Sequence, residues 1–424
     1  MLFSLLWSGQ LWYTDSIWAG QPVRSDDKEK AGYKLERTFD ALVVGAGYAG
    51  AVCARQLAEQ GGKRVLVLER RDHIGGNAYD CLDQAGVLIH QYGPHIFHTN
   101  DKRVFDWLSR FTPWRDYQHR VIANIPDNAG GRMTYPVPFN LTSLETAFGP
   151  KEGKRLGDKL LAEYGAEQKV TILELRQNAD PEIAALADYV YEHVFVHYTM
   201  KQWGQKPEEI DPNTTARVPV FLSRDDRYFQ DAFQGMPQEG YTPMFERMLD
   251  HPNITVELGC DALKRLDVNG EQIRVDGEVF DGPVIYTGQA DELFGFQFGP
   301  LPYRTLDFRF ETLPQDDFQG YGTVNYTVDE DYTRITEFKH LTGQKVPGKT
   351  TIVKEYSRAY TGAPGEIPYY AIINPDNNAR YGQYKALAEK FSNLHLLGRL
   401  AEYKYYNMDA IAGRALDLAE ELLK

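Results

Sequence analysis

Cysteine, positive charge and long apolar runs are all scarce in this chain of 424 residues. Its three cysteines, Cys53, Cys81 and Cys260, have neither disulfide nor metal-ligand spacing, which suits a protein of the reducing cytoplasm. The formal net charge of −14 argues against a nucleic-acid or anionic-membrane surface. An anionic ligand would therefore need positive charge supplied locally, so the arginines are the side chains to follow.

The N-terminal stretch lacks what a membrane span or a secretory signal requires. Residues 1–20 are apolar and rich in tryptophan, but Gly9, Gln10 and Asp15 interrupt them, and the run is too short to cross a bilayer. No basic residue precedes Arg24, so the charged start of a signal peptide is missing. We interpret residues 1–38 as an N-terminal extension of unassigned role that could be disordered, and we predict no stable membrane insertion.

The strongest motif of the chain lies in the stretch 41–50, which reads ALVVGAGYAG. A short apolar strand runs into a glycine-rich turn and a helix over residues 48–60, and a second strand, 63–68, ends at Glu69. This order of elements is the dinucleotide fingerprint, in which the acid accepts hydrogen bonds from a ribose. The sequence therefore predicts a cofactor with an ADP moiety, with an ordinary glycine-bearing loop as the alternative. The fingerprint glycines are Gly45, Gly47 and Gly50.

A glycine pair and a run of histidines follow the fingerprint. Gly75 and Gly76 come soon after the second strand, where they favour a second phosphate contact of a flavin-binding chain over a plain turn. His90, His95 and His98 fall within nine positions. Because no carboxylate or cysteine stands at ligand spacing, we favour histidines that donate hydrogen bonds to a ring cofactor over a metal site.

A helical period dominates residues 141–204. The clearest helix begins at Asp180, a favourable N-cap before Pro181, and it carries aromatic side chains towards its end near Gly204. Core packing is the alternative role for those aromatics. Residues 204–217 contain two prolines and no periodicity, so we expect a mobile loop that can close over a ligand rather than a passive connection.

Short alternating runs recur after residue 300 and predict an antiparallel sheet. They cover residues 303–310, 322–327, 333–338 and 351–356, and turn signals separate them. The overall prediction is a mixed α/β (α+β) fold with a Rossmann-like FAD-binding domain, an inserted helical domain and an antiparallel β-sheet domain. The FAD-binding domain is predicted to comprise residues 39–115, 232–300 and 385–424. The helical domain is predicted to comprise residues 139–215, and the β-sheet domain residues 116–138, 216–231 and 301–384.

Five separate runs, in one order along the chain, resemble UDP-galactopyranose mutases of the bacterial type, and the resemblance extends from Phe39 to the C-terminus. It implies interconversion of UDP-galactopyranose and UDP-galactofuranose by reduced FAD, through a bond between flavin N5 and sugar C1 and without net redox change. The absence of a Ser-His-Asp set or paired-acid motif is consistent with a cofactor acting as the nucleophile. The runs are DHIGGN (72–77), YGPHIFHTN (92–100), YTMKQWG (198–204), YTRITE (332–337) and GRLAEYKYY (398–406).

The resemblance also implies a set of site residues. Arg217 on the loop and Arg304 on a strand would hold the diphosphate in catalytic roles, because guanidinium groups match phosphate oxygens and stay charged. Implied substrate contacts are Phe195, Tyr198, Thr199, Trp203, Tyr228, Tyr332, Tyr405, His119 and Asn407. Implied cofactor contacts are Gly45, Gly47, Ala49, Gly50, Glu69, Arg70, Gly76, Asn77, His95, Ile96, His98, Arg399 and Met408.

Two positions depart from the family pattern. Asn407 stands where an aspartate is usual, so a role that needs a carboxylate there is not expected, and His119 stands where some members carry asparagine. The resemblance further implies UDP as a ligand, an NAD(P)H-linked flavin reductant, a cytoplasmic homo-oligomer such as a dimer, and a product used for surface polysaccharide. The alternatives are a flavin amine oxidase-like enzyme and a non-enzymatic relative such as a Rab GDP-dissociation inhibitor, which share the opening fingerprint.

Overall fold

The computed structural model describes residues 38–127, 130–205 and 219–424. Arg217, almost all of the expected mobile loop and almost all of the N-terminal extension therefore lie outside the described residues. Residues 39–424 form one compact unit, and the predicted domain boundaries within it stay a prediction. In the described part of the chain, no helix combines the length and apolarity needed to cross a bilayer.

A five-stranded parallel sheet has the fingerprint strand at its centre. Its inner strands are apolar and almost completely buried, as expected for a sheet covered on both faces. Two further strands, near residues 254 and 284, lie in the stretch 232–300 that is predicted to belong to the Rossmann-like domain, and they pair in parallel within this sheet. Its order is β12 (Ile254–Glu257), β2 (Val65–Leu68), β1 (Ala41–Val44), β16 (Val284–Tyr286) and β22 (Leu394–Leu396).

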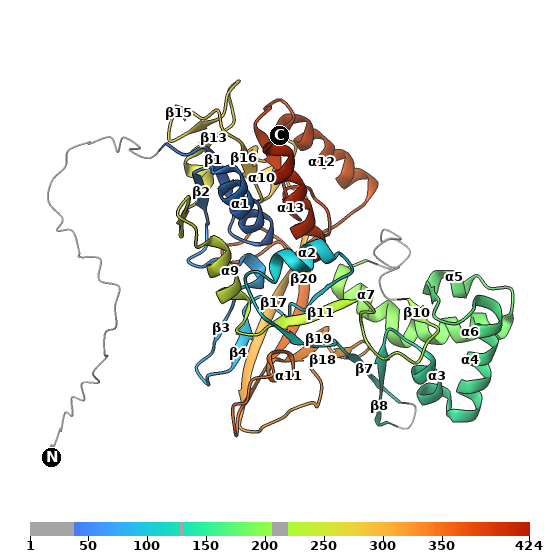
Figure 1. Cartoon of the computed structure of the whole chain (residues 1–424). Coiled ribbons are helices and arrows are strands. Elements are labelled where there is room, and N and C mark those ends of the chain that lie inside the picture. Colours follow the sequence, from blue (N-terminus) through green and yellow to red (C-terminus); the bar gives the residue numbers. More distant parts are fainter. Residues whose placement is uncertain (1–37, 128–129, 206–218) are drawn as a thin grey trace, which may run out of the picture. The chain divides into compact units, whose positions relative to one another are not determined.

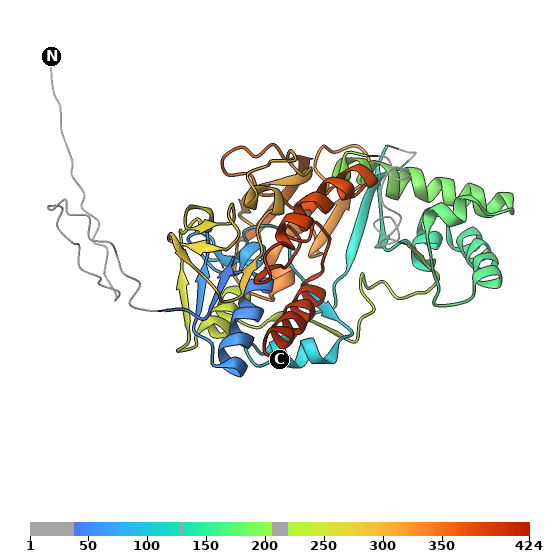
Figure 2. The same cartoon turned by 90° about the horizontal axis from the view of Figure 1, so that it is seen from above.

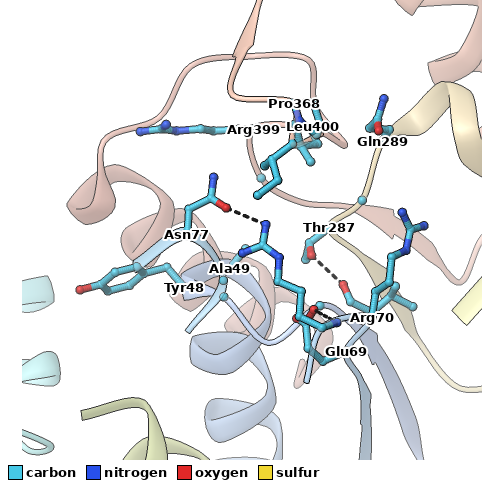
Figure 3. Close-up of a pocket in the computed structure, with 18 of the residues that line it drawn as sticks. Tyr48, Ala49, Glu69, Arg70, Asn77, Thr287, Gln289, Pro368, Arg399 and Leu400 are labelled. Carbon is cyan, nitrogen blue, oxygen red and sulfur yellow. Dashed lines mark hydrogen bonds between the residues drawn. The ribbon is translucent and has the colours of Figure 1, made fainter. Parts of the chain in front are cut away.

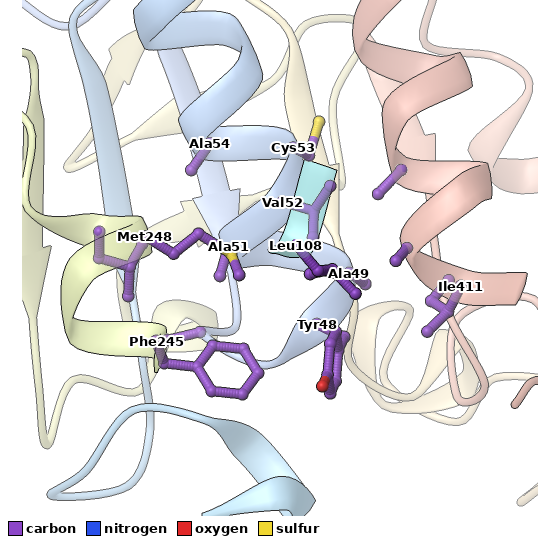
Figure 4. Close-up of a cluster of buried hydrophobic side chains, with 14 of the residues drawn as sticks. Tyr48, Ala49, Ala51, Val52, Cys53, Ala54, Leu108, Phe245, Met248 and Ile411 are labelled. Carbon is purple, nitrogen blue, oxygen red and sulfur yellow. The ribbon is translucent and has the colours of Figure 1, made fainter. Parts of the chain in front are cut away.

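Helix α1 (Tyr48–Gly61) packs with small side chains against its neighbours, as the fingerprint predicts. Ala51 and Ala54 face Phe245 and Met248 of α9 (Tyr241–Leu249), as Figure 4 shows. On its other side α1 lies beside α13 (Met408–Leu422), which Figure 2 shows in the turned view. Small residues let the helices approach closely, so the first turn of α1 is fixed at the end of β1.

The predicted helical region contains five α-helices (green in Figure 1). The Asp180 carboxylate accepts hydrogen bonds from the backbone N–H groups of Glu182 and Ile183, which confirms the predicted N-cap. The helix differs from the prediction in one turn, residues 191–195, which is π-helical. In that turn the His193 carbonyl accepts a hydrogen bond of 2.6 Å from the Thr327 hydroxyl. The helices are α3 (Leu141–Phe148), α4 (Pro150–Tyr164), α5 (Ile172–Arg176), α6 (Pro181–Val190) and α7 (Val196–Trp203).

A second sheet has seven strands, and every neighbouring pair is antiparallel except β18 with β7. The four strands predicted after residue 300 are all present, although β17 and β20 are longer than the alternation suggested (Figure 1). The order is β21 (Tyr370–Ala371), β17 (Tyr303–Leu313), β20 (Thr350–Ala359), β19 (Arg334–Glu337), β18 (Thr323–Tyr326), β7 (Val121–Pro126) and β8 (Arg132–Val137).

Candidate active site

A cavity of about 350 Å³ lies at the carboxyl ends of β1 and β2, where α1 begins. Figure 3 shows Glu69 and Arg70 on one side of this cavity and Arg399 with Leu400 on the opposite side. Segments that are far apart in the sequence therefore meet around one space, as a dinucleotide site requires. The predicted cofactor residues that line it are Gly45, Gly47, Ala49, Glu69, Arg70, Gly76, Asn77, His95, Arg399 and Met408.

The glycine turn has no room for a side chain at its first glycine. Gly45 has a φ of +102°, and a Cβ there would lie 2.1 Å from the Thr287 hydroxyl oxygen. Glu69 is buried, and its carboxylate accepts hydrogen bonds from the backbone N–H groups of Ala46 (2.7 Å) and Arg71 (2.9 Å). The acid thus holds the turn together at the place where the fingerprint puts a ribose.

Two neighbouring arginines behave differently at this cavity. Arg70, the residue predicted from the sequence, is exposed and forms ion pairs with Glu292 (2.9 Å) and Asp261 (3.6 Å). Arg71 donates to the Asn77 side-chain oxygen at 2.8 Å and lies over the Tyr92 ring at 4.3 Å. Its Nη1 is buried with no hydrogen-bond partner in the described part of the chain. Arg71 is therefore a cation available to an anionic ligand, and the sequence prediction missed it.

His90 and His95 are held in defined neutral forms. His90 Nδ1 accepts a hydrogen bond of 3.0 Å from the backbone N–H of His95. His95 Nδ1 is 2.9 Å from the Gly93 carbonyl oxygen, so this nitrogen carries the proton. Burial lowers the pKa of each imidazole to about 3. His95 lines the cavity, but its protonated nitrogen is used by the Gly93 carbonyl, so the ring has no donor left for a cofactor and the predicted donation is not supported.

The third histidine of the run, His98, serves a different purpose. Its Nδ1 lies 2.8 Å from the Asp231 carboxylate, and its ring stacks on Phe229 at 3.5 Å. Neither His98 nor the predicted Ile96 or Gly50 is among the residues that line the cavity. Gly50 acts one step away, because a Cβ there would lie 1.9 Å from the Gly45 carbonyl oxygen.

A buried ion pair lies beyond the cavity, in the seven-stranded sheet. Arg334 on β19 faces Glu355 on β20, and its Nε donates to the carboxylate at 2.7 Å. Glu355 is buried, with a side chain that is 1% exposed. The run 332–337 contains Arg334, but the residue predicted from that run is Tyr332. The signal that could have identified Arg334 is a basic residue between the buried Thr333 and Ile335 of a central strand.

The positive charge of Arg334 acts on several predicted site residues. Burial raises the pKa of Tyr198 and of Tyr370, and the nearby guanidinium of Arg334 opposes both shifts. Burial, with a smaller contribution from the charge of Arg334, lowers the pKa of His119 to about 3. These residues come from α7, from β21 and from the chain before β7, so the fold gathers them around one cation. Tyr370 was not predicted from the sequence.

A row of aromatic rings connects α7 with the cofactor cavity. Trp203 lies 5.2 Å from Tyr370, and Tyr370 stacks on Tyr405 at 6.1 Å with an interplanar angle of 13°. The Arg399 guanidinium lies 4.3 Å from the centre of the Tyr405 ring. Since Arg399 lines the cavity, the cavity and the aromatic row share a wall. Tyr228 joins this region through an edge contact of 5.7 Å with His119.

The other predicted substrate residues lie outside the group of side chains around Arg334. Tyr332 packs between Tyr326 and Tyr356. Phe195 belongs to the core of the helical region, and Thr199 is buried on α7. Asn407 is exposed and its side chain makes no capping bond to α13. The structure therefore places Phe195 in the packing role that the sequence analysis left open.

Arg304 lies at the end of α7. Its Nε donates to the Gln202 carbonyl at 3.2 Å, and its Nη2 donates to the Lys201 carbonyl at 3.1 Å. Burial lowers the pKa of Arg304, and in the described ranges no carboxylate pairs with it. The side chain thus satisfies carbonyls that the helix end leaves free, just before the segment that leads to Arg217.

The buried histidines predict that the free energy of unfolding falls steeply at acidic pH. His90, His95 and His119 have folded pKa values of about 3, whereas the unfolded value is about 6.5. As the pH falls below about 6.5, the unfolded chain takes up protons that the folded chain refuses, so stability is lost. We expect His119→Asn to lower the slope of unfolding free energy between pH 4 and pH 6 by about 1.4 kcal/mol per pH unit. Urea unfolding at several pH values measures this slope, and equal slopes in both proteins would contradict the assignment.

One cluster in the described ranges has metal-ligand chemistry, namely Asp317, Glu337 and His340. The buried Glu337 carboxylate already accepts hydrogen bonds from two backbone N–H groups and from the Thr350 hydroxyl. His340 Nε2 lies 2.9 Å from Asp317 and 3.6 Å from Glu337. Since the buried acid is satisfied, we interpret the cluster as an ion pair that anchors the loop before β18.

Comparison with known proteins gives matches over most of the chain. The family model described as UDP-galactopyranose mutase matches residues 193–405, and that of an NAD(P)-binding Rossmann-like domain matches residues 43–111. The UDP-galactopyranose mutase of Mycoplasma pneumoniae is 37% identical over 91% of this chain and 96% of its own length. A probable UDP-galactopyranose mutase of Klebsiella pneumoniae is 38% identical over 90% of this chain and 94% of its own length.

Two further comparisons bear on substrate and fold. The dTDP-fucopyranose mutase of Escherichia coli is 36% identical over 90% of this chain and 98% of its own length. The crystal structure of a reduced UDP-galactopyranose mutase superposes with a TM-score of 0.67 at 17% identity, covering 91% of this chain and 94% of that one. By contrast, the (S)-6-hydroxynicotine oxidase of Paenarthrobacter nicotinovorans matches only 24% of this chain, at 28% identity.

Proposed function

The chain belongs to the UDP-galactopyranose mutase family, and from this membership we propose that it interconverts UDP-galactopyranose and UDP-galactofuranose without net redox change. The observation that carries the proposal is the shared wall between the dinucleotide cavity and the cluster around Arg334. A flavin at the cavity and an anionic nucleotide at the cluster would meet across Arg399 and Tyr405. The amine oxidase-like alternative is represented among the curated relatives by the (S)-6-hydroxynicotine oxidase, which matches only 24% of this chain.

We propose FAD, in its reduced form, as the cofactor of the cavity. The glycine turn and the N-terminus of α1 suit a pyrophosphate, Glu69 suits the ribose, and the unpartnered Nη1 of Arg71 offers a donor to an anion. Asn77, His95, Arg399 and Met408 would contact the remainder, together with the other predicted residues. When bound and reduced, the flavin supplies a nucleophilic nitrogen, so no side-chain nucleophile is required.

We propose that Arg334 carries much of the substrate's diphosphate charge. Glu355 fixes the guanidinium from one side, which leaves its other N–H groups for phosphate oxygens. Tyr198 and Tyr370 would donate hydroxyl hydrogen bonds, since burial raises the pKa of both phenols and keeps them protonated at neutral pH. Tyr405 would add a third hydroxyl contact. A fixed cation and fixed hydroxyls would stabilise the negative charge that develops as UDP leaves the sugar.

The remaining predicted residues keep their proposed roles. Arg217 and Arg304 would also hold the diphosphate, with Arg304 acting from the end of α7. Trp203 would lie towards the sugar, Tyr228 and Tyr332 would add hydroxyl contacts to the phosphates, and Phe195 would support the uridine pocket from the helical core. Thr199, His119 and Asn407 would act as supporting contacts. We further propose a cytoplasmic homo-oligomer, such as a dimer, that receives electrons from an NAD(P)H-linked reductant and supplies furanose for a surface polysaccharide.

The proposed roles of Arg217 and Arg304 can be tested by removing each guanidinium. We expect Arg217→Ala and Arg304→Ala to retain bound FAD, because neither residue is a proposed cofactor contact. Loss of one phosphate contact should lower kcat/KM by about 10²- to 10³-fold. Flavin absorbance and furanose formation by the reduced variants measure the two effects. A nearly normal rate in either variant would show that its guanidinium does not bind the diphosphate.

The redox state of the active protein separates the proposal from its alternative. We expect furanose only after dithionite has bleached the bound flavin, and no oxygen consumption that depends on UDP-galactopyranose. An amine oxidase-like enzyme would turn over with oxidised flavin and yield peroxide. dTDP-fucopyranose belongs in the same assay as a second substrate, because identity to that relative is nearly as high. Turnover by the oxidised protein alone would contradict the proposed mechanism.

A further inference from the structure

The turn between β22 and α13, residues 397–407, is closed by one carboxylate. The Glu402 side chain accepts hydrogen bonds at both ends of this turn, from the Gly398 backbone N–H at 2.8 Å and from the Tyr406 hydroxyl at 3.0 Å. The Glu402 backbone N–H also donates to the Gly398 carbonyl at 2.9 Å. Gly398 has a φ of +106°, so the closed turn begins from a conformation that favours glycine. Glu402 thus ties the first residue of the turn to a residue near its end.

Both ends of this turn face the cofactor cavity. Gly398, Arg399, Leu400 and Tyr406 line it, and Figure 3 shows Arg399 and Leu400 across from Glu69. The Arg399 Nε donates to the Tyr406 carbonyl at 2.7 Å. The orientation of the Arg399 guanidinium therefore depends on the position of the Tyr406 backbone. The hydrogen bond between the Tyr406 hydroxyl and Glu402 in turn holds Tyr406 in place.

The same turn also positions a residue of the proposed substrate site. Tyr405 lies under the Arg399 guanidinium at 4.3 Å and stacks on Tyr370. A displacement of Tyr406 would move its neighbour Tyr405 and the Arg399 contact together. Glu402 itself is not among the residues that line the cavity; its carboxylate lies near Tyr406 and Tyr381.

The backbone of the turn has a second, independent anchor. Tyr403 is buried with a φ of +46°, and its hydroxyl donates to the Pro302 carbonyl (2.7 Å), with the Ile372 carbonyl oxygen also within reach at 3.1 Å. These bonds hold the middle of the turn to the rest of the fold without Glu402. Loss of the Glu402 carboxylate should therefore loosen the two ends of the turn while its middle stays in place.

We propose that Glu402 is a positioning residue, which holds Arg399 towards the cofactor and Tyr405 towards the nucleotide sugar through its bonds to Gly398 and Tyr406. The proposed effect on Tyr405 and the substrate rests on the proposed function. The proposed effect on Arg399 and the cofactor rests only on the cavity that would hold the flavin. It predicts that changes at Glu402 affect cofactor and substrate binding together, although the side chain contacts neither ligand.

Four variants test this role. Glu402→Ala removes both bonds, and Tyr406→Phe removes only the hydroxyl bond. Glu402→Gln can keep both, because its oxygen can accept from the Gly398 N–H while its amide donates to the Tyr406 hydroxyl. Glu278→Gln, an exposed change on β15 (Glu278–Val279), is the control. The readouts are the FAD dissociation constant, the visible circular dichroism of bound flavin, and separate kcat and KM values.

We expect Glu402→Ala to weaken FAD binding about tenfold and to raise KM by a similar factor, since a hydrogen bond to a charged group is lost at each end. Tyr406→Phe should show a smaller change of the same kind and an altered flavin spectrum. Glu402→Gln should stay within about threefold of wild type. If Glu402→Ala does not fold, Tyr406→Phe with Glu402→Gln decides the matter.

The results that would overturn the proposal are specific. Wild-type FAD affinity, flavin spectrum and KM in Glu402→Ala, or in Tyr406→Phe, would show that the carboxylate has no positioning role. A lower melting temperature with unchanged FAD affinity and KM would show a merely structural role. If the wild-type protein has no mutase activity, the proposed function fails, and the FAD affinity and flavin spectrum of the same variants still decide the cofactor part.

Discussion

Replacing Arg334 by methionine is expected to lower kcat/KM for UDP-galactopyranose by about 10³-fold while FAD stays bound. Arg334 is the cation around which Tyr198, Tyr370 and His119 gather. A fixed positive charge in a partly buried site stabilises a leaving diphosphate far more than solvent does. Arg334 is not among the residues that line the cofactor cavity, so flavin binding should be unaffected.

The single replacement also leaves Glu355 buried without its partner. Breaking a buried ion pair on one side costs about 3–5 kcal/mol of stability, so inactivity could reflect unfolding. The double variant Arg334→Met/Glu355→Gln removes both charges and is the matched control for folding. Arg334→Lys keeps the charge but loses the planar donors, and we expect partial activity from it.

Steady-state kinetics of the reduced variants, with melting temperatures and flavin content, measure these effects. A folded double variant that holds FAD but shows no mutase activity would support the assignment to the diphosphate. Nearly wild-type kcat/KM in that variant would contradict it, and would return Arg217 and Arg304 to the centre of the phosphate site.

The second large effect is expected from Gly50→Ala. A Cβ at this position would lie 1.9 Å from the Gly45 carbonyl oxygen and 3.0 Å from Val43 Cγ1. The added methyl group can be accommodated only if α1 moves away from β1. Overpacking of this kind costs about 1–3 kcal/mol of stability or more. Because the N-terminus of α1 forms the cofactor site, we expect a destabilised protein that is purified without flavin.

A second glycine provides the control for this prediction. Gly382 lies in α12 (Pro375–Ala388), and a Cβ there would meet no heavy atom within 4 Å. Alanine suits a helix interior better than glycine, so Gly382→Ala should be neutral or stabilising by about 0.5–1 kcal/mol. Absorbance of bound flavin and thermal unfolding compare the two variants. Normal flavin content in Gly50→Ala would show that the close approach of α1 to β1 is not required.

The sequence predicts those parts of the fold whose cause is local. The fingerprint glycines, the apolar strands around them and the N-cap at Asp180 each have a short-range physical reason, and the structure confirms the elements that they imply. Membership of the family was also predicted from separate runs and is confirmed. Local patterns could not predict the π-helical turn at 191–195, because its freed carbonyl is satisfied by Thr327, more than a hundred residues away.

The part of the site that the sequence missed depends on contacts between distant residues. Arg334 and Glu355 meet because β19 and β20 pair in one particular register, and no spacing rule reveals that register. Arg70 and Arg71 are adjacent in sequence, and only the fold shows that Arg70 has acidic partners while Arg71 has an unpartnered Nη1. The choice of arginine is therefore decided by burial and by partners, neither of which a motif contains.

The central claim is that this chain isomerises a nucleotide sugar without consuming reducing equivalents. The most direct test mixes anaerobic, dithionite-reduced protein, freed of excess reductant, with a hundredfold excess of UDP-galactopyranose. Chromatography then follows furanose while absorbance follows the flavin. We predict that furanose approaches its equilibrium share over many turnovers while the flavin remains reduced. Flavin that reoxidises in step with substrate, or no furanose at all, would contradict the claim.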